Sequence, residues 1–499
     1  MTRAWVRELA GWLGAAAVSL VTAGAVASSA RADLLFRDGD SMVVAMLARS
    51  LLSGEPLDWA MSSVLFLPES AAFTALDEAV PVDASGLFAI SAVVNLLALY
   101  GAIRLTAGRA RAGMAPVAWS VLALAVFGVL AMTDVSASRE ALDLASLQLT
   151  TTYYSATVVA AVLTIGIVRR MIDSRALMAW PSIGLGVVAF VSTLSNPLYA
   201  AWATIPLVML LAIASVSPGL RSRAPVIIAV LLAGTTLGFL SRIPLAAWIT
   251  KTGVDYIQPG QWHESIDYYG RLVGERMQSP LGVIGLLIAA ALIVAAVVRT
   301  VRAGDPGSRL VAAMAWVAPV MVVVGAVMLG THAARYLQPF AFAPVLALVA
   351  APHALRVGDR VRRPAAVMVG VLLLVAGGLS IPRLADAATR PDADLTCVTD
   401  WVDASGRTGA GQFWTVRLPK LHLADPSQLV QVDHQLNAYA WLVDRTDFAV
   451  GEVSFLVEDS QTVPWDPPQA VLPESVVDCG RYSILDLGTE TLPLGPQRS

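Results

Sequence analysis

Acidic side chains that follow the first long apolar run are the clearest candidates for chemistry in this sequence. The segment Phe36-Arg37-Asp38-Gly39-Asp40-Ser41 leads into residues 42–52, whose apolar residues recur at helical spacing. This spacing predicts a helix lying in a membrane surface. A carboxylate at the start of such a helix has two interpretations: a helix cap, or a general base that takes a proton from an acceptor hydroxyl. Asp38 and Asp40 are therefore the candidate catalytic residues.

Other polar residues interrupt apolar stretches further along the chain. Glu69 follows Pro68 within one such stretch and is either an exposed loop residue or a substrate contact. Arg335 lies in the short segment Thr331–Pro339, where its planar guanidinium suits a phosphate and equally suits an interfacial position beside Tyr336. His332 belongs to the same segment, and Asn196 stands in a sharp Ser195-Asn196-Pro197 turn.

Two more segments between apolar runs carry polar or aromatic side chains. One contains Asp134, Arg139, Glu140 and Asp143. The other, residues 244–279, is rich in Trp and Tyr, which suit an anchor at the membrane interface and also suit stacking on sugar rings.

Motifs typical of soluble enzymes are missing from the sequence. It contains no P-loop, no His-Glu-x-x-His, no Cys-x-x-Cys and no Gly-x-Ser-x-Gly. The five histidines are scattered, so no metal site is predicted and the cofactor stays unknown; a divalent metal is compatible with the sequence but not required by it. The net charge of −3 argues against a nucleic-acid partner.

The elements that must position these residues are membrane spans. The chain of 499 residues is 56% hydrophobic and 14% charged, whereas soluble domains carry about 25% charged residues. Apolar runs long enough to cross a bilayer of about 30 Å predict about eleven transmembrane helices, near residues 9–29, 86–104, 114–133, 153–168, 176–194, 198–217, 225–243, 280–298, 310–330, 338–355 and 365–382.

Arginines in the short loops predict the orientation of these spans. Basic residues precede the first span and follow every even-numbered one: Arg3, Arg7, Arg104, Arg109, Arg111, Arg169, Arg170, Arg175, Arg221, Arg223, Arg299, Arg302, Arg309, Arg356, Arg360, Arg362 and Arg363. The N-terminus is thus expected in the cytoplasm of a bacterium and the segment after about residue 384 outside its inner membrane. The first apolar run is longer than a usual signal sequence, which favours an uncleaved span over a cleaved signal peptide ending near Ala30-Arg31-Ala32.

The composition changes near residue 384, which divides the chain into a transmembrane domain, 1–384, with an external loop, 30–85, and a C-terminal domain, 385–499. Alternating residues predict strands at 412–417, 429–432 and 453–457. The fold class expected is an all-α polytopic membrane bundle with a C-terminal extracytoplasmic β-rich or α+β domain. Cys397 and Cys479 both fall in that domain, where a disulfide can persist, so we expect them to be paired rather than free.

These features resemble the GT-C class of polytopic glycosyltransferases, which take a sugar from a polyprenyl-phosphate donor. The resemblance rests on four short motifs and the cysteine-bearing tail, and it is closest to an uncharacterised bacterial branch. The motifs are Asp38-Gly39-Asp40, Leu67-Pro68-Glu69, Ser195-Asn196-Pro197-Leu198-Tyr199 and Ala334-Arg335-Tyr336-Leu337-Gln338-Pro339. Members of the class tend to carry Asp where this chain has Asn196.

The resemblance implies roles for these residues. Asp38 or Asp40 would deprotonate the acceptor, a glycan or lipid of the cell envelope. Arg335, with His332 and Tyr336 beside it, would hold the lipid phosphate, and Glu69 and Asn196 would contact substrate. Membrane lipid and the polyprenyl-phosphate sugar are then the expected partners.

Two other functions compete with sugar transfer. A transporter or flippase predicts ionisable residues at mid-membrane and two similar halves, and the sequence has neither. A non-catalytic envelope scaffold is compatible with the sequence, and Asn196 favours it. Sugar, acceptor and oligomeric state stay open.

Overall fold

The computed structural model describes residues 2–54, 57–174, 179–216, 219–354, 359–469 and 471–499. Arg175 and Arg356, used above to predict orientation, lie outside this part of the chain. Two compact units make up the protein. The first comprises Met1–Ala32, Phe88–Ile243 and Val254–Ala388, and the second comprises Asp33–Leu87, Pro244–Gly253 and Thr389–Ser499. The C-terminal segment thus shares a unit with the segment that follows the first helix.

The protein is mostly helical, as the sequence predicts. In the described residues six helices, not eleven, are long and apolar enough to cross a membrane: α1 (Thr2–Ala27), α5 (Ala84–Thr106), α7 (Ser155–Asp173), α12 (Pro280–Arg302), α13 (Pro306–Met328) and α16 (Asp359–Ala388). The other predicted runs also form helices, but shorter ones: α6 (Pro116–Met132), α8 (Ala179–Ser195), α9 (Ile205–Ala214), α10 (Ala224–Leu240), α14 (Pro339–Phe342) and α15 (Leu346–Ala350). At 1.5 Å per residue, the 17 residues of α6 extend about 26 Å, less than the hydrocarbon layer of about 30 Å.

Local interruptions explain two of the shorter helices. Residues Ala200–Thr204 form a π-helical turn, η2, directly before α9. Pro339 begins α14 after the 3₁₀ turn η5 (Ala334–Leu337), because proline fits the first position of a helix but lacks the N–H that continues one.

Side-chain hydrogen bonds connect helix ends of the first unit in two places. Arg169, near the end of α7, donates to the carbonyls of Thr106 (2.6 Å) and Val349 (3.0 Å). Near the start of α7, the side chain of Gln338 donates to the carbonyl of Tyr153 at 2.8 Å, and after the end of α13, Ser265 donates to the carbonyl of Thr331 at 2.7 Å. Ser265 belongs to α11 (Trp262–Met277), which follows the short turns η3 (Val254–Tyr256) and η4 (Pro259–Gln261).

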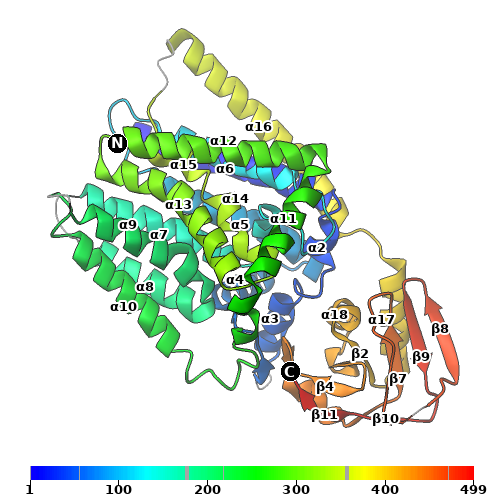
Figure 1. Ribbon diagram of the computed structural model, residues 1–499. Coiled ribbons are helices and arrows are strands. Elements are labelled where there is room, and N and C mark those ends of the chain that lie inside the picture. The colour runs from blue at the N-terminus through cyan, green and yellow to red at the C-terminus, as the bar shows by residue number, and fades with distance from the viewer. Residues whose placement is uncertain (1, 55–56, 175–178, 217–218, 355–358, 470) are drawn as a thin grey trace. The chain divides into compact units, whose positions relative to one another are not determined.

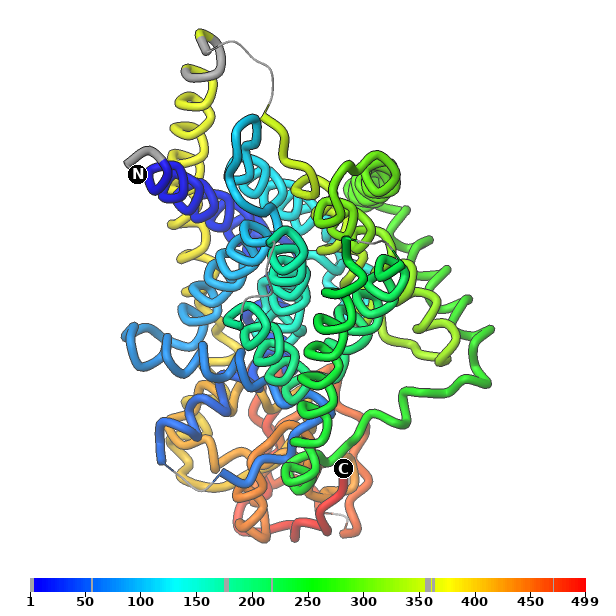
Figure 2. Tube along the Cα trace, turned by 90° about the vertical axis from the view of Figure 1, so that its left-hand side faces the viewer, coloured from blue at the N-terminus to red at the C-terminus, as the bar shows by residue number. Residues whose placement is uncertain are grey.

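Small residues allow α1 to pack along α16, although these helices lie far apart in the sequence (Figure 2). A Cβ at Gly24 would lie 3.1 Å from the carbonyl oxygen of Ser380, and one at Gly377 would lie 2.9 Å from the Cα of Ala17. Such close backbone approach is typical of helices that pair in membranes.

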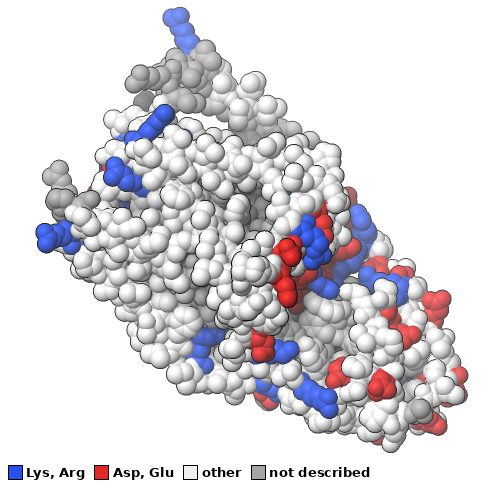
Figure 3. Space-filling model, viewed as in Figure 1, with Lys and Arg blue, Asp and Glu red and all other residues white. Residues whose placement is uncertain are grey.

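Apolar side chains cover much of the outside of the helical unit. On the face drawn in Figure 3, charged residues are sparse over the helices and more frequent over the C-terminal segment. Leu287 of α12 and Leu372 of α16 are 64% and 60% exposed. Exposed apolar surface of this extent is what a bilayer covers.

The second unit is built on a sheet with two helices of the C-terminal segment, α17 (Ala393–Ser405) and α18 (Phe413–His422) (Figure 1). Among the described residues the sheet has seven strands in the order β11-β4-β3-β2-β7-β9-β8. Their bounds are β2 (Gly409–Gln412), β3 (Leu429–Val432), β4 (Asn437–Tyr439), β7 (Phe455–Glu458), β8 (Ser475–Cys479), β9 (Tyr482–Asp486) and β11 (Gly495–Arg498). Strand β2 is parallel to both β3 and β7, and α18 connects β2 to β3.

Shorter elements complete the second unit. They are the helices α2 (Ala32–Phe36), α3 (Val43–Ser53) and α4 (Leu67–Ala79), the 3₁₀ turns η6 (Pro426–Gln428) and η7 (Arg445–Val450), and two small strand pairs, β1 (Trp59–Ala60) with β5 (Val443–Asp444) and β6 (Glu452–Val453) with β10 (Leu492–Pro493).

Alternating side chains give the sheet a core on each face. Leu429, Phe455 and Val457 pack with residues of α17 and α18, while Val430 and Leu456 belong to a second buried cluster. The predicted disulfide is confirmed: Cys397 of α17 is bonded to Cys479 of β8.

Two of the three predicted strands of the C-terminal segment are confirmed. Residues 429–432 form β3, and residues 453–457 cover parts of β6 and β7. The strand predicted at 412–417 is wrong, because β2 ends at Gln412 and the rest opens α18.

Candidate functional site

The Asp38-Gly39-Asp40 segment forms a tight turn in the second unit. The carboxylate of Asp38 accepts a hydrogen bond from the backbone N–H of Asp40 at 3.1 Å. Helix α3 begins after this turn with Met42 as its N-cap, and no side chain caps it. The N-cap position of α3 is therefore Met42, and neither Asp38 nor Asp40 occupies it. The predicted helix is present as α3, but its first half, Val43–Ala48, is buried rather than lying on a membrane surface.

A buried arginine supports this turn. Arg417 of α18 is fully buried, and its Nε donates to the carbonyl of Gly39 at 2.8 Å. Its Nη1 donates to the carbonyl of Leu442 (2.6 Å) and to the side chain of Gln431 (3.2 Å). Gly39 packs so closely on α18 that a Cβ there would lie 3.1 Å from the ring of Trp414.

The charges of the turn act on Arg417. Burial lowers the pKa of Arg417 to about 10, and the carboxylates of Asp40 and Asp38 oppose this shift. An uncompensated charge in the interior is costly, so the half-buried Asp38 and Asp40 stabilise the cation. Arg417 also holds the turn in place through the carbonyl of Gly39.

Glu69 is buried in the first turn of α4, not exposed in a loop. The positive end of a helix favours a carboxylate there. Phe66, directly before α4, has φ of 49°, a left-handed conformation that costs a bulky side chain about 1–3 kcal/mol. The surrounding structure thus fixes the entry into this helix.

In the first unit, His332, Arg335 and Tyr336 lie in one segment that packs against α11. The ring of His332 meets that of Tyr268 edge-on, with centroids 5.5 Å apart. The hydroxyl groups of Tyr269 and Thr331 are hydrogen-bonded at 2.8 Å. This part of the first unit therefore brings several aromatic rings against the segment that carries Arg335.

Several phenol groups, together with Arg335, act on the hydroxyl group of Tyr336. Burial raises the pKa of Tyr336, and Tyr154 raises it further, while Arg335 opposes the shift. Burial and the neighbouring Glu140 also raise the pKa of Tyr268. These tyrosines stay protonated at neutral pH and act as O–H donors, which together with Arg335 suits an anionic group.

Asn196 belongs to the same region through the π-helical turn. It is almost fully buried, donates to the hydroxyl of Thr157 at 3.0 Å and accepts from the N–H of Leu198 at 3.0 Å. Trp202, within η2, donates to the carbonyl of Tyr336 at 3.1 Å. The side-chain nitrogen and oxygen of Asn196 are thus both hydrogen-bonded within the protein. The π-helical turn beside it is of a kind that often occurs in functional segments.

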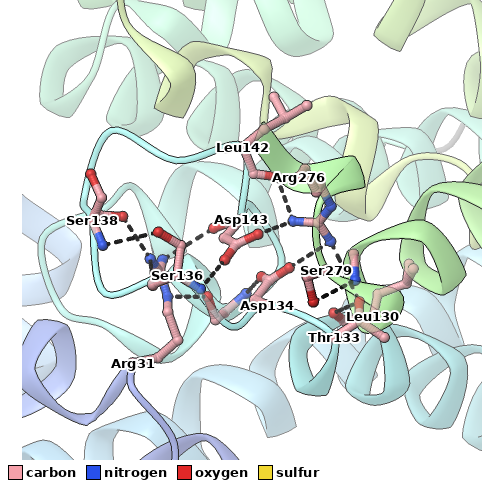
Figure 4. A network of polar contacts seen from close by, with 12 residues as sticks. Arg31, Leu130, Thr133, Asp134, Ser136, Ser138, Leu142, Asp143, Arg276 and Ser279 are labelled. Atoms are coloured by element: carbon pink, nitrogen blue, oxygen red, sulfur yellow. Dashed lines mark hydrogen bonds and ion pairs between the residues drawn. The ribbon is translucent and has the colours of Figure 1, made fainter. Parts of the chain in front are cut away.

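An ion-pair network lies between α6, α11 and the loop that follows α6 (Figure 4). Arg276 of α11 pairs with Asp134 at 2.8 Å and with Asp143. Arg31 donates to the carbonyls of Ser136 (3.0 Å), Ser138 (2.9 Å) and Asp143 (3.1 Å). Burial raises the pKa of Asp134, and Arg276 opposes this shift. Two cations balance two carboxylates, so the network holds the loop in one conformation.

A cavity of about 230 Å³ adjoins this network in the first unit. Asp134 and Arg276 line it together with apolar residues such as Leu130, Val273 and Phe340. It offers an apolar space with one polar end. In the described part of the chain, no group of three or more His, Cys, Asp or Glu side chains is arranged to hold a metal ion.

Sequence reasoning missed Arg417, Arg276 and Arg31. Arg417 appeared only as part of a predicted strand, and Arg31 only as part of a possible cleavage site. The available signal was a lone charge within an apolar stretch, since Arg417 stands between Val416 and Leu418. A charge there must be paired when it is buried.

The chain matches no family model and no curated protein.

Proposed function

We propose that the protein is a membrane glycosyltransferase of the GT-C class, which moves a sugar from a polyprenyl-phosphate donor to an envelope glycan or lipid. The observation that carries the proposal is the Asp38-Gly39-Asp40 turn held on the buried guanidinium of Arg417. A carboxylate on a turn that is fixed in place can take a proton from a hydroxyl group.

The reaction needs one base and one phosphate-binding group. Asp38 or Asp40 takes the proton of the acceptor hydroxyl, whose oxygen forms a bond to the anomeric carbon of the donor sugar. The bond between that carbon and the phosphate oxygen breaks, and the polyprenyl phosphate leaves with the bonding electrons. Arg335, with the phenol of Tyr336 and the imidazole of His332 beside it, binds the phosphate and stabilises the charge that develops on it.

The proposal includes a membrane topology of eleven spans in a bacterial inner membrane, with the N-terminus in the cytoplasm and the C-terminal segment outside. It is supported by the arginines that follow every second predicted span and by the Cys397–Cys479 bond, since disulfides persist outside the cytoplasm. The five predicted runs that form only shorter helices, one of them containing both α14 and α15, would then cross where neighbouring helices cover the helix ends.

Charge-removing variants test the transferase proposal. We expect Asp40→Asn or Asp38→Asn, and Arg335→Ala, to lower transfer at least 100-fold, the usual contribution of a positioned base or a charge-stabilising group. The measurement is complementation of a deletion strain, scored by its envelope glycan profile and by the protein level in its membranes. Asp33→Asn and Arg271→Ala are matched controls, because both charges are largely exposed. Full complementation by all three test variants, or an unchanged profile in the deletion strain, would refute the proposal.

Single cysteines test the topology. In a background carrying Cys397→Ser and Cys479→Ser, a cysteine at Ser475 should react with a membrane-impermeant maleimide added to intact spheroplasts. A cysteine at Ser174 should react only after lysis. Labelling in the reverse order would overturn the proposed orientation.

A non-catalytic envelope scaffold is the second candidate. Asn196, where members of the GT-C class tend to carry Asp, favours it, because its amide is fully engaged by Thr157 and Leu198. Asn196→Asp separates the two functions: a gain in transfer indicates an enzyme that uses this position, and a scaffold shows no response.

A further inference from the structure

Helix α11 has three distinct faces, which follow from its helical spacing and from the burial of its residues. Successive residues of a helix are about 100° apart around its axis. Four large apolar side chains of α11 therefore fall within an arc of about 60°, and all four are exposed. They form an apolar strip along the helix: Trp262 (43% exposed), Ile266 (47%), Val273 (37%) and Met277 (57%).

Protein contacts and charges define the other two faces of α11. Ser265, Tyr269 and Leu272 are buried on the side next to the apolar strip. There Ser265 donates to the carbonyl of Thr331 at 2.7 Å, and the hydroxyl of Tyr269 is hydrogen-bonded to that of Thr331 at 2.8 Å. The exposed charged side chains lie nearly opposite the strip: Glu264, Asp267, Arg271 and Glu275. One face of α11 thus packs on the protein, the next is apolar and exposed, and the third is charged.

The connection between α11 and α12 fixes where the apolar strip lies. Only Gln278 and Ser279 separate the two helices, and α12 is one of the described helices that are long and apolar enough to cross a membrane. Figure 1 shows α11 running crosswise to α12. Leu281 and Ile284 near the start of α12 are 44% and 46% exposed, so exposed apolar side chains occur on both sides of the junction. The strip therefore lies beside the end of a candidate span.

The residues of the apolar strip favour lipid over sugar or protein as its partner. Ile266, Val273 and Met277 have no ring on which a sugar could stack, and Trp262 alone provides one. A helix with one apolar and one charged face, and with Trp on the apolar face, is typical of segments that lie in the plane of a membrane interface. A bilayer that surrounds the exposed side chains of α12 also reaches the start of that helix. Lipid is then already present where the strip lies.

We propose that α11 lies in the headgroup layer of the bilayer, with the apolar strip inserted among the first carbons of the lipid acyl chains and the charged face in water. The partner of this surface is the lipid itself. Glu264, Asp267, Arg271 and Glu275 include more carboxylates than guanidinium groups, so the contact does not depend on anionic headgroups.

The position of α11 also sets the depth of the segment that packs on it. Thr331 is held by the buried face of α11, and the ring of His332 meets that of Tyr268 edge-on. The segment that carries Arg335 is therefore level with the lipid headgroups, where the phosphate of a lipid lies. Its role in binding that phosphate rests on the proposed function, whereas the position of α11 does not.

Fluorescence quenching by labelled lipids measures the depth of each face. The background is the full-length protein with Cys397→Ser and Cys479→Ser, which leaves no cysteine in the chain, in phosphatidylcholine vesicles. Ile266→Cys and Val273→Cys attach an environment-sensitive fluorophore to the apolar strip. Asp267→Cys and Glu275→Cys attach it to the charged face of the same turns and are the matched controls. All four positions are exposed, so the fluorophore does not have to enter the core.

We expect nitroxide lipids to quench the fluorophores of Ile266→Cys and Val273→Cys at least about twofold more than those of the controls, because an interfacial helix buries its apolar face about 5–10 Å into the boundary between headgroups and acyl chains. A nitroxide near the start of the acyl chain should quench more strongly than one near its end. Iodide in the water should quench the controls more strongly than the strip.

Three results would overturn the proposal: equal lipid quenching on both faces, no lipid quenching of the strip, or stronger quenching by the nitroxide at the end of the acyl chain. The second result would indicate that water or a protein covers the strip. If Val273→Cys fails to fold, as judged by its trypsin fragments, the neighbouring pair Ile266→Cys and Asp267→Cys decides. No turnover is measured, so the result is independent of the transferase assay.

Discussion

Arg417 connects the Asp38-Gly39-Asp40 turn to the sheet of the second unit. Its guanidinium bonds Gly39, Leu442 and Gln431, and it stacks over the ring of Phe413 at 4.7 Å. Leu442 itself has φ of 54°, so one buried cation holds a strained carbonyl and the candidate catalytic turn at once. Stability and activity should therefore depend on this residue together.

Replacing Arg417 by Met should lower the free energy of unfolding of the second unit by about 3–5 kcal/mol, since buried carbonyl groups and two carboxylates lose their partner. Pulse proteolysis of the full-length protein in urea measures this change. Arg407→Met is the control: Arg407 pairs with Asp486 at 2.8 Å near the surface, and such pairs contribute about 1 kcal/mol or less. Equal effects of the two substitutions would contradict the role given to Arg417.

For Asn196, the sequence indicates the local turn but not the tertiary contacts of the side chain. The sharp turn at Ser195-Asn196-Pro197 is visible in the sequence, because Asn and Pro favour turns. The partner Thr157 and the π-helical turn that carries Trp202 are not visible, since they depend on how α7 and α8 pack. Residue types thus indicate where chemistry is possible, and tertiary contacts decide which side chains are already engaged.

At the scale of elements, α18 shows why the strand predicted at 412–417 is absent. The run Gln-Phe-Trp-Thr-Val-Arg has the residue types of a strand, but β2 is only four residues long. A parallel partner such as β3 can be reached only by a crossover, which is usually helical, and α18 supplies it. Helical spacing then directs Val416 to the core and Arg417 to the turn.

The C-terminal end of α18 should make stability depend on pH. Burial lowers the pKa of His422; Asp83 and Asp392 oppose the shift, and Arg49 adds to it. The folded pKa thus lies below the unfolded value of about 6.5, and between these two values the unfolded chain binds more protons. The free energy of unfolding should therefore fall as pH falls below about 6.5.

His422→Asn should flatten this pH dependence, measured as the urea midpoint in pulse proteolysis between pH 7.5 and 5.5. Gln461→Asn, at an exposed position of the same unit that does not titrate, should leave the dependence as in the wild type. If the urea midpoint of His422→Asn depends on pH as strongly as that of the wild type, another group causes the dependence.

Apolar periodicity predicts helices well and their lengths less well. Each predicted run contains a helix in its described residues, because an apolar segment in a bilayer must satisfy its own backbone. The ends of the helices depend on local chemistry, such as Pro339 and the π-helical turn at Ala200–Thr204, and on side chains from distant segments, such as Arg169 and Arg276. The sequence indicates candidate site residues within separate segments. It does not indicate that Arg417 lies beside Asp38 and Asp40, because this contact joins segments that are distant in the sequence.

At the scale of the whole molecule, the disulfide joins α17 to the edge strand β8 across 82 residues. The bonded Cys479 belongs to the same core as Val398 and Val402. Closing a loop of this length stabilises a fold mainly by restricting the unfolded chain. Loss of the bond should therefore lower the free energy of unfolding of the second unit but change its folded structure little.

The double variant Cys397→Ser, Cys479→Ser should unfold about 2–5 kcal/mol more easily than the wild type in its second unit, with the same proteolytic fragments under native conditions. Wild-type protein treated with a reductant should match the variant, and the variant should not respond to the reductant. Equal urea midpoints in wild-type protein with and without reductant would contradict this expectation.

The division of the chain into units has a consequence for biogenesis. The segment Asp33–Leu87 leaves the ribosome early, but the strands that it needs lie after Thr389. At about 5–20 residues per second, the ribosome takes tens of seconds to supply them. During that time the sheet of the second unit has not been synthesised, so the face of α3 that is buried in the folded protein is exposed. A chaperone of the compartment that receives this segment would therefore be expected to bind it while translation continues.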